Sequence, residues 1–282
     1  MLTVVEPVAR ETDAPAIDAA VTAQWLIAFL RDELLERRGI ERAVLGLSGG
    51  VDSAVTAFLC ARALGPANVY GIRMPYKTSH PSSLTDAQSV VDALKIQCAT
   101  IAITAAVDGY LALEPDADER RRGNVMARMR MLVLFDQSAK LGALPIGTGN
   151  KTERLLGYFT WHADDTPPVN PIGDLFKSQV WELARHLRVP ESLIEKAPSA
   201  DLQADQTDEA DLGITYARAD AILAKLLLGY SDRQMIERGF SARDVALVRG
   251  RVDATHWKRH LPTTAMLTNT AINEFYLRPV DF

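Results

Sequence analysis

The sequence is poor in cysteine and contains no long apolar run. Cys60 and Cys98 are the only cysteines among 282 residues, and each lies in an apolar stretch. Two such residues cannot supply a disulfide framework, so we expect free thiols and a reducing compartment. No apolar run approaches the roughly 20 residues that a helix needs to cross a bilayer, and residues 1–15 lack a signal-peptide pattern. We therefore expect a cytoplasmic protein with no membrane partner.

An excess of basic residues is also absent. The 31 lysines and arginines are outnumbered by 36 acidic residues, which gives a formal net charge of -5 at pH 7. A chain with this balance has no global positive field that would attract nucleic acid. Basic residues cluster only locally, in 120–122 and 258–259. We therefore expect no nucleic-acid partner.

Short apolar segments alternate with helical patterns through the first 177 residues. The expected strands are 43–47, 69–72, 99–103 and 143–146, and the expected helices are 17–38, 54–64, 85–94 and 123–141. This alternation predicts an α/β fold with a doubly wound, mostly parallel sheet flanked by helices. In such folds ligands bind at the carboxyl ends of the strands.

The pattern changes after Lys177. The expected helices are then 177–188, 216–228 and 242–251, with no convincing strand between them. No glycine-serine linker separates two domains, so we expect a single domain over 1–282. Within it, 1–16 is a loose N-terminal arm, 17–177 is the α/β core, and 178–282 is a mainly helical extension with a lid and tail.

The first expected strand ends in a glycine turn that opens the next helix. This segment reads Leu45-Gly46-Leu47-Ser48-Gly49-Gly50-Val51-Asp52-Ser53. The amides and dipole of a helix N-terminus favour an anion, and Gly49 and Gly50 let a phosphate approach closely. Ser48 and Ser53 add hydroxyl donors. Asp52 would repel a phosphate unless a cation lies between them, and Mg²⁺ held by Asp52 and phosphate oxygens removes this conflict.

This segment is not a Walker loop, because no Gly-Lys-Ser or Gly-Lys-Thr follows at the right spacing. The string Ser-Gly-Gly-Val-Asp-Ser resembles the pyrophosphatase loop of the N-type ATP pyrophosphatases, whose fold is adenine nucleotide alpha-hydrolase-like. The resemblance implies that the loop grips the pyrophosphate of ATP while a substrate oxygen attacks the α-phosphate. An adenylate and pyrophosphate form, and a nucleophile then displaces AMP.

Later motifs are similar to those of the NAD synthetase family and follow the family's order. They are Gly147-Thr148-Gly149-Asn150-Lys151-Thr152-Glu153, Asn170-Pro171-Ile172-Gly173-Asp174-Leu175-Phe176-Lys177, Pro198-Ser199-Ala200-Asp201-Leu202 and Gln206-Thr207-Asp208-Glu209. The similarity covers roughly residues 20–262. It implies that ammonia and ATP convert deamido-NAD to NAD, AMP and pyrophosphate through an acyl adenylate. It also implies a homodimer.

The resemblance implies roles for individual residues on the ATP side. Glu153 matches the family's second magnesium carboxylate, beside Asp52, and Lys177 matches a lysine on the ATP phosphates. Arg73 is similar to an arginine that contacts ATP, with a structural ion pair as the alternative. Ser48, Asp52 and Lys177 would support the transition state, and no protein nucleophile is expected. The expected ATP ligands are Gly46, Leu47, Ser48, Gly49, Gly50, Val51, Asp52, Ser53, Arg73, Thr148, Lys177 and Ser199.

On the substrate side, Arg128 stands in the position of an arginine that binds deamido-NAD. A guanidinium suits the phosphates and carboxylate of a dinucleotide because it forms forked hydrogen bonds. Lys258 lies in a segment that resembles the family's C-terminal His-Lys-Arg, which closes over the substrate. Here the segment reads His256-Trp257-Lys258-Arg259, with an additional tryptophan. His256 and Trp257 are therefore further candidate contacts.

Two other positions depart from the family pattern on the nicotinate side. Trp161 stands where many relatives have a lysine that touches the substrate, and Pro168 stands where they usually have an aspartate. Asp164 or Asp165 can take the place of that aspartate. Trp161 and Trp257 either stack on a flat ring of the substrate or pack against protein.

The nitrogen source and two other functions stay open at this point. Glutamine-using relatives carry an amidase domain or a separate partner, and this chain has no spare length for such a domain. Free ammonia is the simplest source, with a glutaminase partner as the alternative. Another function is adenylation of a different carboxylate or of tRNA, although no RNA-binding module is visible. A further one is nucleotide binding without catalysis, although that function does not require both Asp52 and Glu153.

Overall fold

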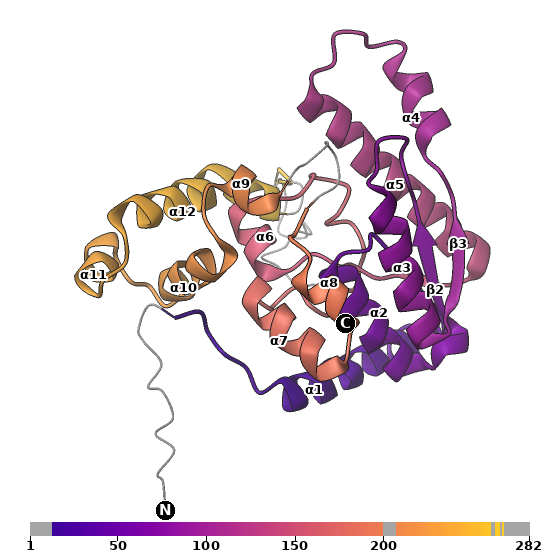
Figure 1. Cartoon of the computed structure of the whole chain (residues 1–282), viewed down its shortest axis with the longest axis horizontal. Helices are drawn as coiled ribbons and strands as arrows, with labels where there is room; N and C mark the ends of the chain where they lie inside the picture. The colour runs from indigo at the N-terminus through magenta and orange to yellow at the C-terminus, as the bar shows by residue number, and fades with distance from the viewer. Residues whose placement is uncertain (1–12, 200–206, 261–262, 266, 268–282) are drawn as a thin grey trace, which may run out of the picture.

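A four-stranded parallel sheet forms the centre of the fold (Figure 1). The computed structural model describes residues 13–199, 207–260, 263–265 and 267. The strands are β1 (Ala43–Gly46), β2 (Val69–Arg73), β3 (Gln97–Thr100) and β4 (Leu144–Pro145). They are hydrogen-bonded in the order β3-β2-β1-β4, and each pairing is parallel. The expected α/β class with a mostly parallel sheet is confirmed.

The strand order reverses between β1 and β4. The chain runs from β1 outward to β2 and β3, and it then returns to place β4 on the other side of β1. Ligands of open α/β sheets bind beyond the carboxyl ends of the strands at such a reversal. Residues 47–50 follow β1 and residues 146–150 follow β4. The fold therefore brings two glycine-rich segments of the sequence to the same place.

Helices cover both faces of this sheet. Ala43 and Leu45 of β1 lie in a large apolar core, whereas the intervening Val44 lies in a smaller cluster with Leu134 on the other face. This difference follows from the alternation of side chains along a strand. All three β1 side chains are fully buried, as a covered parallel strand requires.

The helices of the large core are α1 (Ala19–Arg31), α2 (Val51–Leu64), α3 (Pro81–Leu94), α7 (Lys177–Leu187) and α8 (Glu191–Glu195). On the other face, α5 (Glu119–Leu141) carries Leu134 and packs with α4 (Thr104–Leu111). Short helical turns are η1 (Asp32–Glu36) and η2 (Pro66–Asn68). The large core therefore joins the N-terminal helix to helices that lie more than a hundred residues later.

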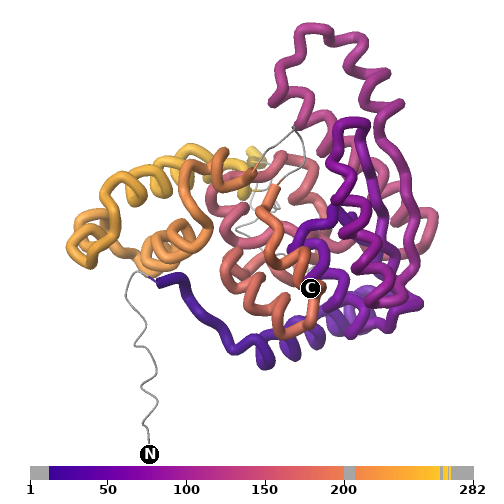
Figure 2. The backbone as a smooth tube through the Cα atoms, in the orientation of Figure 1, coloured from indigo at the N-terminus to yellow at the C-terminus, as the bar shows by residue number. Residues whose placement is uncertain are grey.

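The remaining helices surround a second apolar cluster. They are α6 (Lys151–Leu156), α9 (Asp208–Leu212), α10 (Tyr216–Leu227), α11 (Asp232–Glu237) and α12 (Ala242–Thr255), followed by the turn η3 (His256–Arg259). Leu156, Tyr216 and Val248 are buried in this cluster. Figure 2 shows α9–α12 on the side of the molecule away from β2 and β3. The predicted helical character of the C-terminal part is confirmed for the described residues.

Three details of the sequence-based fold are wrong. The helical periodicity of 17–38 predicts Trp25 as a core residue, but its side chain is 72% exposed. Ala23, Leu30 and Leu34 define the buried face, and Trp25 lies opposite to it. The third strand is Gln97–Thr100 and not 99–103. Ile103 instead packs below α4, a helix that the sequence did not predict.

The two cysteines differ in their burial. Cys60 is buried, Cys98 is half-buried, and both are free thiols. Burial raises the pKa of the Cys60 thiol to about 12, so this residue is not a reactive nucleophile. Over the described ranges, no helix has the length and apolar character needed to span a bilayer.

Candidate active site

The candidate phosphate loop lies between β1 and α2. Gly50 is the N-cap of α2, and Gly49 has a φ of +79°, which residues with a side chain rarely adopt. A Cβ atom on Gly49 would also lie 2.4 Å from the carbonyl oxygen of Ser83 in α3. Glycine is therefore required at this position both by the backbone angle and by the close approach of α3.

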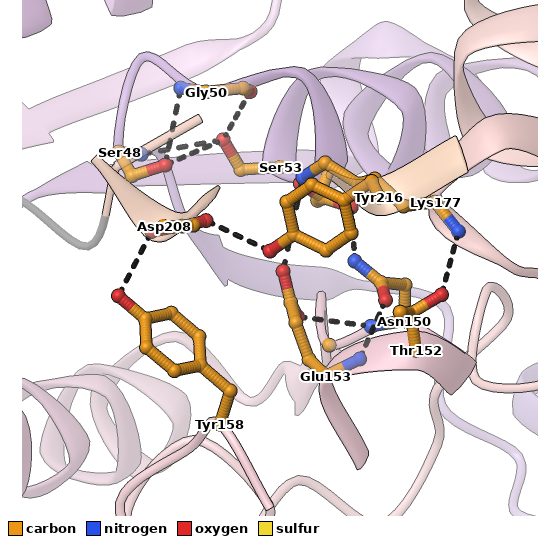
Figure 3. A network of polar contacts seen from close by, with 12 residues as sticks. Ser48, Gly50, Ser53, Asn150, Thr152, Glu153, Tyr158, Lys177, Asp208 and Tyr216 are labelled. Atoms are coloured by element: carbon orange, nitrogen blue, oxygen red, sulfur yellow. Dashed lines mark hydrogen bonds and ion pairs between the residues drawn. The ribbon is translucent and has the colours of Figure 1, made fainter. Parts of the chain in front are cut away.

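Two serine hydroxyls hold the loop in shape (Figure 3). The Oγ atoms of Ser48 and Ser53 lie 3.1 Å apart, and the Gly50 amide donates to Ser48 Oγ at 3.2 Å. Ser53 Oγ donates a hydrogen bond to the Gly50 carbonyl at 3.0 Å. The predicted strand–loop–helix arrangement is thus present. Its position at a helix N-terminus suits an anionic ligand.

Three ionisable side chains meet beside this loop. Lys177, the first residue of α7, is 2% exposed, and its Nζ contacts Asp52 Oδ2 and lies 3.7 Å from Glu153 Oε1. Asp52 lies in the first turn of α2 and Glu153 in the first turn of α6. The structure therefore brings together the two predicted metal carboxylates and the predicted phosphate lysine, which come from the starts of three helices.

Asn150 connects the two carboxylates. Its Oδ1 accepts from the Glu153 amide at 3.0 Å, and Glu153 Oε2 accepts from the Asn150 amide at 3.2 Å, which is a capping box at the start of α6. Asn150 Nδ2 then donates to Asp52 Oδ1 at 2.9 Å. One fully buried asparagine thus sets the position of Glu153 relative to Asp52.

A buried aspartate fixes the start of α7. Thr152 Oγ1 donates to Asp220 Oδ1 at 2.5 Å and accepts from the Lys177 amide at 2.9 Å. The amide of Ser178 donates to Asp220 Oδ2 at 2.8 Å. Asp220 is fully buried and belongs to α10. The two oxygens of Asp220 accept hydrogen bonds from α6 and from α7. Asp220 therefore fixes the position from which the Lys177 side chain extends.

This cluster contains two acidic side chains and one basic side chain. Burial, followed by the nearby Asp52 charge, raises the pKa of Glu153 to about 8. Burial disfavours the charge of Lys177, but Asp52 and Glu153 outweigh burial and hold its pKa above the ordinary value. The lysine therefore stays charged, and the two carboxylates compete for a single cation. An added cation would lower the cost of ionising both acids.

A small cavity lies beside Arg128. It has a volume of about 160 Å³, and the residues that line it are Tyr110, Leu111, Ala117, Arg121, Asn124, Val125 and Arg128. Arg128 Nη2 donates to the Trp161 carbonyl at 3.1 Å, and Thr160 Oγ1 donates to Asn124 Oδ1 at 3.0 Å. These bonds place residues 160–161 next to α5.

The tryptophans that distinguish the predicted substrate side touch each other. The rings of Trp161 and Trp257 meet edge to face with centroids 5.2 Å apart, and His162 lies 4.0 Å from the Trp161 ring. Trp257 is 50% exposed. Packing against protein is therefore observed for both rings, and the half-exposed Trp257 leaves one aromatic surface accessible.

The Lys258 ammonium is bound to the loop that carries Trp161. Lys258 Nζ donates to the Gly157 carbonyl at 2.6 Å and contacts the Phe159 carbonyl, and it lies 4.2 Å from the Phe159 ring centroid. Asp164 accepts from the Thr160 amide at 2.8 Å. The predicted lid residue therefore already rests on residues 157–161 in this structure.

A family model for NAD synthase matches residues 22–262. The chain belongs to the NAD synthase family. The NH(3)-dependent NAD(+) synthetase of Trichlorobacter lovleyi is 46% identical over 258 residues, which cover 91% of this chain and 94% of that protein. The family resemblance deduced from the sequence is confirmed.

Solved structures of this family share the fold. The NMN synthetase from Francisella tularensis has a TM-score of 0.79 at 32% identity, covering 88% of this chain and 99% of that one. The NH3-dependent NAD synthetase from Campylobacter jejuni, solved in complex with the nitrate ion, has a TM-score of 0.76 at 30% identity, covering 89% and 100%. As a NAD synthase family member, the chain is an enzyme that forms a C–N bond with ATP as cosubstrate.

The other predicted ligands of this NAD synthase family member occupy varied surroundings. Arg73 Nη1 donates to the Gln88 amide oxygen at 2.6 Å, so its observed partner is not the carboxylate of a structural ion pair. Thr148 is half-buried after β4, and Ser199 is exposed at the edge of the described residues. His256 is exposed, and its Nδ1 lies 2.7 Å from the Asp253 carbonyl.

The predicted loop positions contribute mainly backbone. Leu47 and Val51 are buried in the large core, and Gly46 ends β1. In this loop, only Ser48, Asp52 and Ser53 present polar side chains. The predicted phosphate loop is therefore mainly a backbone feature, to which three side chains add polar groups.

The residues around Lys177 fit a magnesium ion. Asp52 and Glu153 are oxygen donors, which this cation prefers, and both already face one positive charge. Within the part of the chain that the structure describes, no cluster of three or more His, Cys, Asp or Glu side chains could hold a metal by itself. Such an incomplete ligand set is typical of Mg²⁺, which binds through one or two carboxylates together with substrate phosphates.

Replacing Glu153 by glutamine is expected to change how stability depends on pH. The folded-state pKa of Glu153 is raised from 4.5 to about 8, so its contribution to stability is full below about pH 4.5 and is lost as the pH rises through 8. Glutamine does not titrate. Without divalent cations, Glu153→Gln should therefore gain thermal stability relative to wild type between about pH 5 and about pH 9. If the melting temperatures of the variant and the wild type changed with pH in parallel, this assignment would be contradicted.

Sequence reasoning missed the groups that orient the cluster. Asn150, three residues before Glu153 at a helix start, is a recognisable capping-box pattern and could have been found. Thr152 and Asp220 could not, because they are 68 residues apart and no local pattern pairs them. Asp208 lies in the family motif of residues 206–209, but the motif predicts no role for it. Its two hydroxyl partners, Tyr158 and Tyr216, also come from outside that motif.

Proposed function

We propose that this chain converts deamido-NAD to NAD by amidation with ammonia and ATP, releasing AMP and pyrophosphate. The observation that carries the proposal is the meeting of Asp52, Glu153 and Lys177 at the phosphate loop of a NAD synthase family member. The match covers 94% of the length of an NH(3)-dependent relative, which supports ammonia as the nitrogen source. A glutaminase partner is the alternative that the assay below separates.

In the first step, a carboxylate oxygen of deamido-NAD attacks the α-phosphorus of ATP. The bond to the bridging oxygen breaks, and pyrophosphate leaves. The N-terminus of α2, which follows the loop, and the ammonium of Lys177 would bind the charge that develops on the leaving group. The substrate carboxylate is already anionic at neutral pH, so this step needs no protein nucleophile and no obligatory general base.

In the second step, ammonia attacks the carbonyl carbon of the acyl adenylate. The carbon–oxygen bond to AMP breaks, and one nitrogen-bound proton goes to solvent. The contribution of the protein is to align the two reactants and exclude competing water. The Arg128 guanidinium, beside residues 160–161, is the proposed contact for the dinucleotide's anionic groups. Lys258 and His256 would cover the same side.

Mg²⁺ is the proposed metal, held by Asp52 and Glu153 together with ATP phosphates. Bound there, it would supply neutralisation of the charge on the leaving pyrophosphate. Asn150 would keep the two carboxylates at a fixed separation through its bonds to both. Ser48, Gly49, Gly50, Ser53, Thr148 and Ser199 complete the proposed ATP site, with Arg73 beyond them at the end of β2.

We also propose that the protein is a cytoplasmic homodimer. Large apolar side chains are exposed on and beside α4 and α5, namely Tyr110, Leu113, Leu132 and Phe135. A partner copy packed on these helices would shield this surface from water. It would also adjoin the cavity beside Arg128, which α4 and α5 line. Light scattering coupled to size-exclusion chromatography tests the dimer.

The function is tested by chromatography of products. Purified protein receives magnesium-ATP, ammonium and deamido-NAD, and NAD, AMP and pyrophosphate should appear together. Parallel reactions contain glutamine in place of ammonium or nicotinic acid mononucleotide in place of deamido-NAD. The mononucleotide reaction is included because a similar structure is an NMN synthetase. If product forms only in the mononucleotide reaction, the mononucleotide is the substrate in place of deamido-NAD. If none of the reactions gives product, the proposal is refuted.

Trp161→Ala is expected to weaken deamido-NAD binding. If the Trp161 ring contacts the substrate ring, its loss should raise the KM for deamido-NAD about three- to tenfold and leave the KM for ATP unchanged. The exposed Trp25 on α1 offers a matched control, since Trp25→Ala removes an equal ring far from the site. Steady-state kinetics provide the measurement. An unchanged KM would mean that Trp161 packs only against Trp257 and His162.

A further inference from the structure

Asp208 is a buried carboxylate that joins two tyrosines from distant parts of the chain. It is 4% exposed, and it accepts from Tyr216 through Oδ2 at 2.9 Å and from Tyr158 through Oδ1 at 3.1 Å. Figure 3 shows the two phenols approaching Asp208 from different directions. A buried carboxylate needs such donors because its desolvation is costly. The contact also fixes Tyr158 and Tyr216 relative to each other.

One branch of this arrangement leads to the ATP side. The Tyr216 ring lies 5.3 Å from Lys177 Nζ, so this ring forms part of the wall against which the lysine is held. The Asp208 amide donates to the Pro198 carbonyl at 2.9 Å, next to Ser199. A displacement of Asp208 would therefore disturb residues on two sides of the proposed ATP site.

The other branch leads to the substrate side. Tyr158 lies between Gly157 and Phe159, whose carbonyls both contact Lys258 Nζ. Two residues later, Thr160 bonds Asn124 beside the Arg128 cavity. The position of the Tyr158 hydroxyl thus depends on the loop that carries Trp161 and on the C-terminal turn η3.

The Tyr158 hydroxyl has a choice of acceptors. It lies 3.1 Å from Asp208 Oδ1 and 2.8 Å from Asp211 Oδ2. A phenol has a single proton to donate, so it makes one strong bond to one of these carboxylates at a time. Asp208 is buried, and Asp211 is exposed. The two bonds therefore define two local arrangements, of which only one ties the substrate-side loop to Asp208.

We propose that Tyr158 and Asp208 are positioning residues that couple deamido-NAD binding to ATP binding. Binding of deamido-NAD against residues 157–161 would favour the Tyr158–Asp208 bond, and that bond would steady Tyr216 beneath Lys177 for ATP. This inference rests on the proposed function, since it requires both substrates in these places. Coupling of this kind is reciprocal, so each substrate would tighten the binding of the other by the same factor.

The test is a binding cycle measured by calorimetry with magnesium and α,β-methylene ATP. In the wild type, saturating deamido-NAD should tighten binding of the analogue by about fivefold or more. Tyr158→Phe keeps the ring in the second apolar cluster and removes the proton. Its coupling should fall below about twofold, because the hydroxyl that links the two sites is gone. Asp211→Ala removes the competing acceptor at the surface, so the Tyr158–Asp208 bond should form even without deamido-NAD. The ATP analogue alone should then bind more tightly than in wild type, and its coupling to deamido-NAD should be smaller.

Tyr230→Phe is the matched control, because Tyr230 contacts the same cluster and its ring stacks with Lys225 and Arg238 outside the site. It should keep the wild-type coupling. Wild-type coupling in Tyr158→Phe, or no coupling in the wild type, would overturn the inference and leave the proposed function standing. A wild-type protein that binds the ATP analogue but not deamido-NAD would overturn the proposed function together with this inference.

Discussion

Asp52→Asn and Glu153→Gln should each lower kcat by at least about a hundredfold, as loss of a strong electrostatic contribution to a transition state does. Each substitution removes one of the two carboxyl groups that face Lys177. In the proposed reaction both would hold the metal on the departing pyrophosphate as carboxylates. Without one of them, ATP should still enter the loop, but the charge that develops on the leaving group would be poorly neutralised.

The fold should survive both changes. Glutamine is acceptable at the third position of a capping box, so Glu153→Gln preserves the start of α6. Asparagine at 52 keeps an oxygen for Asn150 Nδ2, and Lys177 retains Glu153 as an acidic neighbour. Circular dichroism and melting temperature check this point.

The measurement is pyrophosphate release in a single turnover over a range of magnesium concentrations. Asp174→Asn is a suitable control, because Asp174 belongs to the motif that ends at Lys177 and has a fully exposed side chain that pairs with Lys151. It should keep wild-type activity. Full activity in either Asp52→Asn or Glu153→Gln would refute the assignment of both carboxylates to the metal.

Gly49→Ala should abolish most ATP binding. Alanine is strained at a φ of +79°, and its Cβ would lie 2.4 Å from a backbone oxygen that cannot rotate away. The loop or the start of α3 must therefore move, and the hydrogen bonds that the Ser48 and Gly50 amides donate to serine hydroxyls would be disturbed. We expect a loss of about 1–3 kcal/mol in stability from the strain and a rise of about tenfold or more in the KM for ATP.

Gly65→Ala separates strain from the loss of the site. Gly65 ends the same helix α2 and has a φ of +82°, but a Cβ there would meet nothing within 4 Å. This variant should lose stability by about 1 kcal/mol and keep the wild-type KM for ATP. Denaturant unfolding and initial-rate kinetics on both variants provide the comparison. An unchanged KM in Gly49→Ala would show that the loop does not bind the nucleotide.

The fold and the strand–loop–helix arrangement of residues 43–64 were largely predictable because their signals are local. A parallel strand buried on both faces leaves a continuous apolar run such as Ala43–Leu45, and a phosphate loop leaves a glycine-rich string directly after it. The motif order then identified Glu153 and Lys177. Glu153 and Lys177 meet Asp52 because of the strand order. The alternation of strands and helices predicts a parallel sheet but does not specify the order of its strands.

The parts that escaped prediction depend on contacts between distant segments. Trp25 and Leu30 are both large apolar residues in one helix, and only the positions of α2 and α7, against which this helix packs, decide which of them is buried. Likewise, Asp220 reads as a helix-surface acid until α6 and α7 are placed against it. The edge-to-face contact of Trp161 and Trp257 joins residues 96 positions apart, a distance at which a single sequence carries no pairing signal.

Asp220 has a consequence for how the molecule can come apart. It lies on α10, a helix of the second apolar cluster, yet its carboxylate accepts from the Ser178 amide in the first turn of α7, a helix of the large core. Opening of either cluster alone would leave a buried charge without its donors, so the two should unfold as one cooperative unit. The Ser178 amide should then exchange its hydrogen only at the rate of global unfolding. Chain breaks near Lys177, where the helical extension begins, would consequently remove the catalytic site and the stability of the fold in the same event.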